Sequence, residues 1–155
     1  MTNWEKPFLI SFKQAFFTDS ELSRTPVDTN ICIYLFRGKY AVKDKINEVG
    51  IENCAISEIT LAELIYGAES SSNPTKNHNL IRELTEQIVT ISILDSVTEY
   101  GRQKSRLRKQ GLLISDFDLL IGSTAIANDL IMVTQNVREF ERLERIKLVN
   151  WIDAS

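Results

Sequence analysis

Short apolar runs alternate with longer helical stretches along the chain from about residue 28 onward. Four runs rich in β-branched and aliphatic residues predict strands, and four longer stretches predict helices. The predicted strands are residues 53–57, 88–94, 130–134 and 147–149, and the predicted helices are residues 58–68, 75–87, 97–110 and 117–128. Ser57 is expected to cap the first helix, and Gly111 to end the third. Apolar strands separated by helices predict an α/β fold with a parallel sheet covered on both faces.

Composition excludes several classes of protein. The 155 residues suit one domain, and 43% hydrophobic and 25% charged residues are typical of a globular protein. No apolar run approaches the roughly 18 residues that cross a bilayer, and the start lacks the basic region of a signal peptide. We therefore expect a cytoplasmic protein that does not contact membranes, with Cys32 and Cys54 as buried free thiols. The net charge of −3 argues against a generally basic nucleic-acid coat protein.

Three carboxylates, Asp28, Glu63 and Asp118, interrupt otherwise apolar segments. Buried carboxylates are costly unless they are paired or bound to a cation, and no Lys or Arg flanks these three closely. Asp28 and Asn136 each follow a predicted strand and so belong to the edge of the sheet where ligands bind. The pattern indicates a divalent metal site at that edge.

Each position also has a local structural interpretation. Glu63 could complete a capping box with Thr60, but Ser57 is the better cap and leaves Glu63 in mid-helix. Ser115 and Asp118 fit a capping box as well. Other local alternatives are a polar cap cluster at 28–30 and a turn at Asn136. Against a mere cap at Asp118, the small residues Gly122 and Ala125 lie on the side where its side chain points and suggest a cleft.

Two further polar residues are assigned smaller roles. Asp116 is expected mainly as a helix cap, with a secondary contact to the metal as the alternative. The single histidine, His78, is placed in a polar loop at residues 76–79. One chain therefore cannot supply a histidine pair for acid–base catalysis, and no Cys/His spacing indicates zinc.

In order along the chain, these segments resemble the PIN domain, and more narrowly the VapC-type ribonuclease toxins of bacterial toxin–antitoxin modules. The resemblance covers about residues 27–151 and is carried by four blocks, 27–31 (VDTNI), 57–67 (SEITLAELIYG), 116–122 (DFDLLIG) and 133–140 (VTQNVREF). It implies a three-layer α/β/α sandwich, Mg²⁺- or Mn²⁺-dependent hydrolysis of RNA phosphodiester bonds, a homodimer, and a cognate antitoxin whose tail occupies the active-site groove. The residues implied are Asp28, Glu63 and Asp118 as the catalytic and metal-binding set, Asn136 as a further ligand where many relatives have Asp, and Thr29 and Thr134 as supports of the site.

The resemblance also divides the chain. Residues 25–155 are expected to form the nuclease domain, and residues 1–24, with an apolar segment at 8–12, an N-terminal extension of unknown role. Residues 24–27 would make a poor central strand, because Pro26 lacks an N–H donor. Either this segment supplies a variant first strand, or the chain starts at an unusual point.

A basic stretch at residues 102–109 is a candidate RNA surface. Arg102, Arg106 and Lys109 share one face of the predicted helix and could contact phosphates. The alternative is that they complement the helix dipole and solvate the surface. Arg138, beside the loop at Asn136, is a further candidate.

Two other functions compete with the nuclease. A catalytically weak PIN-like module that binds RNA or protein is favoured by Asn136, but the three intact acids argue against it. A phosphatase with Asp28 as nucleophile is disfavoured, because Asn30 stands where haloacid-dehalogenase-type enzymes carry a second Asp.

Overall fold

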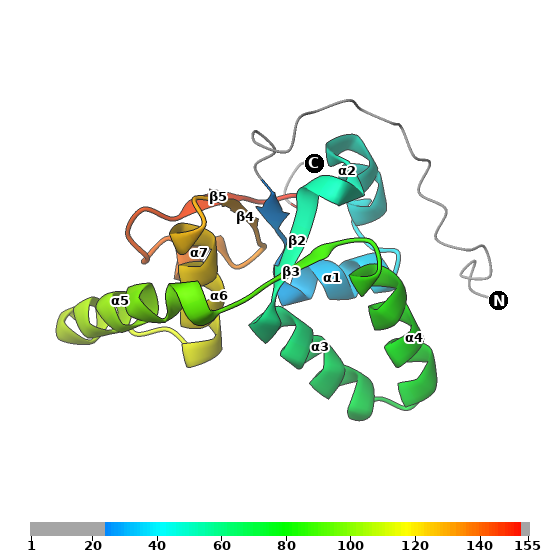
Figure 1. The fold of residues 1–155 in the computed structure, drawn as a ribbon, viewed down its shortest axis with the longest axis horizontal. Helices are drawn as coiled ribbons and strands as arrows, with labels where there is room; N and C mark the ends of the chain where they lie inside the picture. The colour runs from blue at the N-terminus through cyan, green and yellow to red at the C-terminus, as the bar shows by residue number, and fades with distance from the viewer. Residues whose placement is uncertain (1–23, 153–155) are drawn as a thin grey trace.

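The computed structural model describes residues 24–152, which form five short strands and seven α-helices (Figure 1). The prediction about residues 1–24 lies outside the described residues, apart from Arg24. The strands are β1 Thr25–Pro26, β2 Cys54–Ser57, β3 Val89–Ile91, β4 Ile131–Val133 and β5 Lys147–Val149. The helices are α1 Thr29–Phe36, α2 Val42–Val49, α3 Glu58–Glu69, α4 Pro74–Thr85, α5 Val97–Gln110, α6 Asp116–Ala127 and α7 Val137–Phe140, with short 3₁₀ turns η1 Ile51–Asn53 and η2 Leu94–Ser96.

The described strands all pair in parallel. β2 lies between β1 and β3, β4 pairs with β5, and a bridge between Val27 and Val133 joins the two groups. The resulting order is β3-β2-β1-β4-β5, and every residue of β2 is buried, as expected of an inner parallel strand. The predicted parallel sheet is confirmed.

Residues 25–27 do form the middle strand, in spite of Pro26. The Val27 N–H donates to the Ala55 carbonyl oxygen of β2 (2.8 Å), and the Asp28 N–H donates to the Val133 carbonyl oxygen of β4 (2.9 Å). Because alternate residues of a parallel strand bond to the same neighbour, the donor missing at Pro26 is one that would face β4. The contact between β1 and β4 is accordingly reduced to a single bridge. The segment is thus a variant first strand.

Two apolar cores lie on opposite faces of the sheet. In β4, Val133 belongs to the core formed with α1–α4, whereas Met132 belongs to the core formed with α5, α6 and α7. Neighbouring strand residues point to opposite faces, so each core has its own layer of helices. Figure 1 shows α1–α4 on one side and α5, α6 and α7 on the other. The three-layer α/β/α sandwich is confirmed.

Local signals explain most helix ends. Ser57 caps α3, where its Oγ accepts from the Thr60 N–H (3.0 Å), and Gly111 ends α5 in the left-handed conformation (φ 69°). The loop expected at 76–79 is wrong. Asn73 caps α4 and Pro74 begins it, so His78 is helical and its Nε2 lies 2.7 Å from Glu69 Oε1.

Other boundaries differ from the sequence prediction. The strand expected at 88–94 pairs only over Val89–Ile91, and η2 starts at Leu94. The eight-residue helices α1 and α2 were not predicted as helices. Gly38 (φ 62°), Tyr40 (φ 56°) and Ala41 (φ 51°) turn the chain from α1 into α2, and only the first of these three left-handed positions is a glycine.

Cys32 and Cys54 are buried and unbridged, as predicted. Within residues 24–152, no helix is long and apolar enough to cross a membrane.

Gly122 does not open a cleft below Asp118, as the sequence suggested. It is buried in α6, where a Cβ would overlap the Leu143 side chain and lie 3.3 Å from Phe140. We expect Gly122→Ala to lower the free energy of unfolding by about 1–3 kcal/mol, the usual cost of overpacking. Denaturant unfolding measures the change.

Gly101→Ala in α5 is the matched control, because its Cβ would meet nothing within 4 Å. This change should raise the free energy of unfolding by about 0.4–1 kcal/mol. Equal destabilisation by both substitutions would contradict the steric explanation.

Candidate metal centre

Asp28 lies at the carboxyl end of β1 and is 5% exposed. Its Oδ1 accepts from the Thr29 N–H (2.7 Å) and its Oδ2 from the Thr134 hydroxyl (2.9 Å). The Thr134 hydroxyl oxygen in turn accepts from the Asn136 N–H (3.0 Å). Asp28 also caps α1, so the capping interpretation is correct as local structure. These bonds hold the carboxylate at the edge of the sheet where ligands bind.

Glu63 in α3 and Asp118 in the first turn of α6 are half-buried. Burial raises the pKa of both carboxyl groups and of Asp28 above their ordinary values. The charge of Asp118 raises the pKa of Asp28 further, and the charges of Asp28 and Asp118 both raise that of Glu63. Because such effects weaken with distance, the three carboxylates share one electrostatic neighbourhood.

Asp118 also takes part in the cap of its own helix. Ser115 Oγ donates to Asp118 Oδ2 (2.9 Å) and accepts from the Asp118 N–H (3.1 Å). Ser115 thus caps α6 as the capping-box interpretation expected, but the Asp118 carboxylate is oriented by the Ser115 hydroxyl and not by the backbone N–H of a complete capping box.

Asp116 belongs to a different cluster. It is exposed, and its Oδ1 accepts from Lys104 Nζ (2.7 Å) and from the Tyr100 hydroxyl (3.1 Å), both in α5. The cap of α6 is Ser115, so the cap assigned to Asp116 is wrong. Its carboxylate is already neutralised by Lys104 and is not grouped with the three acids.

Glu139 in α7 is a carboxylate that the sequence analysis missed. Burial has the largest effect on the pKa of Asp118, and the hydrogen bond from Ser115 has the next largest. The negative charge of Glu139 is the third cause, and it raises the pKa of Asp118. Glu139 follows Asn136 by three residues, the spacing of one helical turn. That spacing was the available signal, but residues 135–136 were taken only as a loop. Glu139 therefore adds a further negative charge in the neighbourhood of Asp118.

The donor groups suit a hard cation. Within residues 24–152, no Lys, Arg or His forms an ion pair with Asp28, Glu63 or Asp118. The buried Thr29 hydroxyl lies beside Glu63, and its contact with that carboxyl group lowers the pKa of Glu63. Carboxylate and hydroxyl oxygens are ligands for Mg²⁺. As the described side chains are placed, however, no three His, Cys, Asp or Glu groups converge closely enough to hold one ion. The donors fit a divalent cation, and their final arrangement requires side-chain movement.

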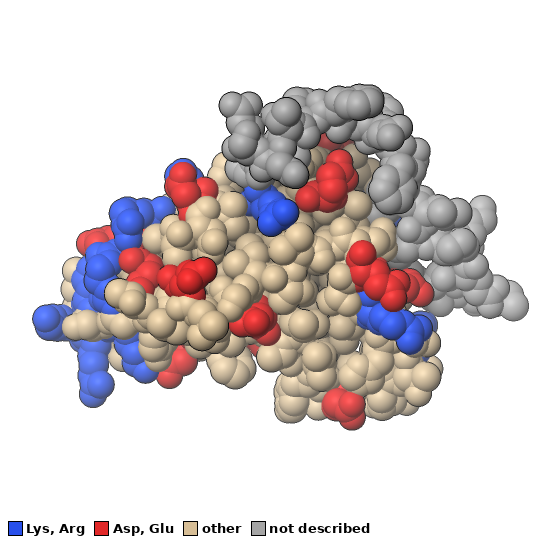
Figure 2. All heavy atoms as spheres, in the orientation of Figure 1, with Lys and Arg blue, Asp and Glu red and all other residues tan. Residues whose placement is uncertain are grey.

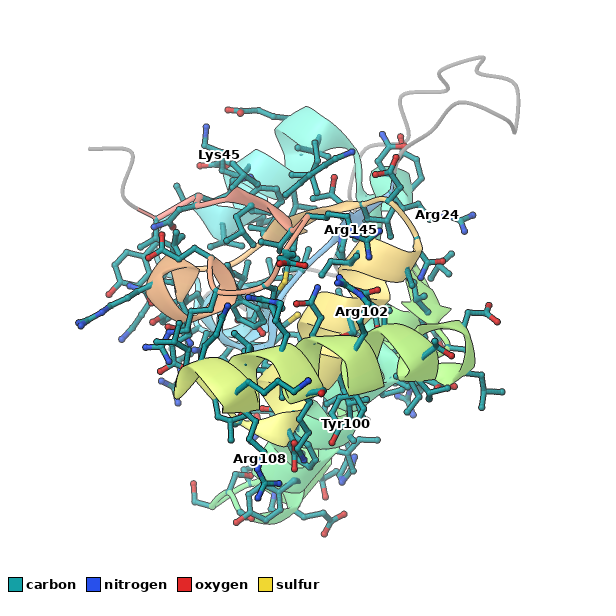
Figure 3. All side chains as sticks on the ribbon, turned by 90° about the vertical axis from the view of Figure 1, so that its left-hand side faces the viewer. Arg24, Lys45, Tyr100, Arg102, Arg108 and Arg145 are labelled. Carbon is teal, nitrogen blue, oxygen red and sulfur yellow. The ribbon has the colours of Figure 1, made fainter. Side chains whose placement is uncertain are left out.

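The basic face of α5 is largely neutralised. Lys and Arg side chains gather over this helix at the left of Figure 2, with acidic side chains among them. Arg102 pairs with Glu99 (2.7 Å) and Glu144 (2.9 Å), and Arg106 Nε lies 3.5 Å from Glu144. In Figure 3, Arg102 and Arg145 lie above α5, whereas Tyr100 and Arg108 lie below it. Two of the three predicted RNA contacts on this face are thus held in ion pairs.

The remaining basic candidates are exposed. Lys109 near the end of α5 and Arg138 in α7 form no ion pair with the described residues. Their role in RNA binding stays a prediction.

The sequence of this chain matches a family of known proteins. Residues 27–146 match the family model of the PIN domain. The chain belongs to the PIN-domain family. A tRNA(fMet)-specific endonuclease VapC of Shigella flexneri is 38% identical over 130 residues, which are 81% of this chain and 96% of that protein. A ribonuclease VapC2 of Haemophilus influenzae is 34% identical over 128 residues, with the same shares covered.

A solved structure agrees with these sequence relatives. The crystal structure of VapBC2 from Rickettsia felis, bound to a promoter DNA fragment, matches this PIN domain with a TM-score of 0.76. The match has 33% identity and covers 82% of this chain and 98% of that chain. The PIN-domain, VapC-type relationship expected from the sequence is confirmed.

PIN-domain nucleases generally depend on divalent metal ions. We expect Mg²⁺ to stabilise this PIN domain, because a cation relieves the repulsion among the carboxylates. At a concentration about 100 times the dissociation constant, Mg²⁺ should raise the free energy of unfolding by about 2.7 kcal/mol. Thermal unfolding in Mg²⁺ and in EDTA measures the shift, and Asp118→Asn should reduce it. Superimposable melts of the wild-type protein would contradict this expectation.

The three carboxyl groups of the site also make the stability of the metal-free PIN domain depend on pH. Because the pKa values of Asp28, Glu63 and Asp118 are raised, the folded state binds more protons than the unfolded state between the ordinary and raised values. Their contribution to stability is thus lost as the pH rises through that window, and the Mg²⁺ effect should be largest above it. Glu99 acts oppositely. Hydrogen bonds led by that from Arg102 lower its pKa to about 2, so its contribution is lost as the pH falls toward that value.

Proposed function

We propose that this protein is a divalent-metal-dependent endoribonuclease that hydrolyses RNA phosphodiester bonds as the toxin of a toxin–antitoxin module. The observation that carries the proposal is the shared neighbourhood of Asp28, Glu63 and Asp118, without a paired cation, in a PIN domain. The names of the VapC relatives, endonuclease and ribonuclease, support RNA hydrolysis as the reaction.

The proposed roles follow from the surroundings of each residue. Asp28, Glu63 and Asp118, with Asn136 and Glu139, would hold Mg²⁺, or Mn²⁺ in its place. A metal ion in this position supplies an activated water and stabilises the charge that develops on the scissile phosphate.

The hydrogen bonds to Asp28 prepare it for this role. Those from the Thr134 hydroxyl and the Thr29 N–H oppose the effect of burial on its pKa, and so favour the ionised, ligating form. Glu63 and Asp118 are more exposed than Asp28, and we expect these two side chains to turn toward the cation.

The direct test is incubation of the purified protein with total RNA and Mg²⁺, followed by mapping of the cleaved ends. The tRNA(fMet) is mapped first, because the Shigella relative is named for it. We expect discrete fragments that EDTA and Asp28→Ala abolish. Intact RNA after incubation with the folded wild-type protein would refute the proposal, and equal cleavage by Asp28→Ala would indicate a contaminating nuclease.

We also propose that this protein binds a cognate antitoxin. The solved VapBC complexes of Rickettsia felis and Salmonella typhimurium support a cognate antitoxin. A homodimer and a cytoplasmic location stay predictions from the sequence.

A catalytically weak binding module is the second candidate function. Asn136 in place of Asp and the lack of a preformed three-ligand cluster in the described chain favour it. Calorimetric titration with Mg²⁺ separates the two, since only the nuclease requires the cation.

A further inference from the structure

A groove of about 440 Å³ lies between α1, α3 and α4. Glu63 lines this groove, so the groove reaches one carboxylate of the candidate metal centre. Its lining includes the buried side chains of Leu64 and Ile81 and the half-buried ring of Phe36. The groove therefore offers an apolar surface directly beside a carboxylate of the site.

Three exposed cations also line the groove. Arg37 and Lys39 follow the end of α1, and Lys76 lies in the first turn of α4, so positive charge comes from two separate elements. Within the described chain, none of these three side chains forms an ion pair. The cations at the start and middle of α5 differ, since Glu99, Asp116 and Glu144 neutralise them. With Arg138 in α7, these three groove residues are thus the cations of the described chain that lie near the candidate site without an ion pair.

This combination matches a nucleic-acid strand. Unpaired Lys and Arg attract phosphates with release of counterions, and an apolar lining accepts the faces of unstacked bases. A strand that is cut beside Glu63 must also continue past it on one side, and the groove lies next to that residue.

We propose that the groove between α1, α3 and α4 binds the RNA strand next to the scissile phosphate, with Arg37, Lys39 and Lys76 contacting its phosphates. The basic face of α5 is not the main RNA surface. This inference rests on the proposed function, because it assigns the substrate path of the same site. An acidic protein segment would be attracted by the same cations, and the test separates that occupant from RNA.

The test compares two charge-matched double variants of the full chain, both in an Asp118→Asn background in which cleavage is expected to be slow. Arg37→Gln/Lys76→Gln removes one cation from each side of the groove, and Arg108→Gln/Lys109→Gln removes two exposed cations from the end of α5. Figure 1 shows α5 and α4 at opposite ends of the molecule, so the two variants change separate surfaces. Fluorescence anisotropy with labelled tRNA(fMet) gives the dissociation constant over a series of salt concentrations.

The groove variant should bind RNA more weakly, and its salt-dependence slope should fall by about 0.7 for each lost contact to a single strand. The α5 variant should keep the parental affinity and slope. Arg37→Lys/Lys76→Arg, which retains both charges, should keep most of the affinity and shows that charge, not folding, is responsible.

An unchanged affinity and slope in the groove variant would overturn the inference, and this is also the result expected if the groove serves a protein partner alone. Loss of binding only in the α5 variant would overturn it as well. Cleavage of total RNA by the otherwise wild-type chain, measured in parallel, reports on the proposed function separately. RNA cleavage with unaltered binding by the groove variant would therefore refute the substrate path and leave the nuclease intact.

Discussion

Asp118→Asn is expected to lower the rate of RNA cleavage by about 10³-fold, because under the proposed function it removes one of the charges that would hold the cation at the scissile phosphate. Asn keeps the size of the side chain and its ability to accept from Ser115 Oγ, so the helix cap should survive. Single-turnover cleavage of the mapped RNA, with thermal unfolding of the same sample, measures both effects.

Asp116→Asn is the matched control for this prediction. Asp116 lies in the same helical turn, but its carboxylate is held by Lys104 and Tyr100 on the side of α5. Its replacement should leave the cleavage rate near that of the wild-type protein. Equal losses in the two variants would show that the negative charge of the whole helix start matters, and that Asp118 is not a ligand.

Phe140→Ala is expected to lower the free energy of unfolding by about 3–5 kcal/mol, the usual cost of emptying a large core site. Phe140 is fully buried in the core beneath α5 and α6, and its ring also contacts the space at Gly122. It is the last residue of α7, the short helix that carries Glu139 and follows Asn136. We therefore expect a weaker effect of Mg²⁺ on stability as well as a lower melting temperature.

Phe117→Ala tests whether burial is the cause. Phe117 is 54% exposed at the start of α6, and its truncation should change stability by no more than about 0.5 kcal/mol. Denaturant unfolding of both variants makes the comparison. A large loss from Phe117→Ala would point to an interface that covers this ring in solution.

Some strands and helices could be predicted because their signals lie within a few consecutive residues. Residues 54–56 are apolar and buried, and helix 97–110 ends at a glycine with positive φ, so both elements were recognisable from a few neighbouring residues. Residues 29–36 were harder. The apolar run is as short as a strand, and only Asp28 capping it from the edge of the sheet marks it as a helix.

In the candidate site, too, some features could be predicted from neighbouring residues and others could not. Asp28, Glu63 and Asp118 were conspicuous because each is an acid in an apolar segment, which is a property of neighbouring residues. The engagement of Asp116 with Lys104, and of Arg102 and Arg106 with Glu144, depends on how α5 packs against α6 and the chain before β5. Sequence separation hides such pairs, since the partners are not neighbours along the chain.

By itself, the sequence determined most strands and helices after residue 53, the PIN-domain relationship and three acids that lack a nearby counter-charge, because each of these depends on short-range pattern. Only the tertiary structure decided that residues 25–27 form the middle strand, that Gly122 is packed against Leu143, and that Glu139 lies near Asp118. It also decided which cations remain unpaired. Pairing, packing and electrostatic proximity are properties of distances in space, and those distances are set only when distant segments of the chain meet across the sheet.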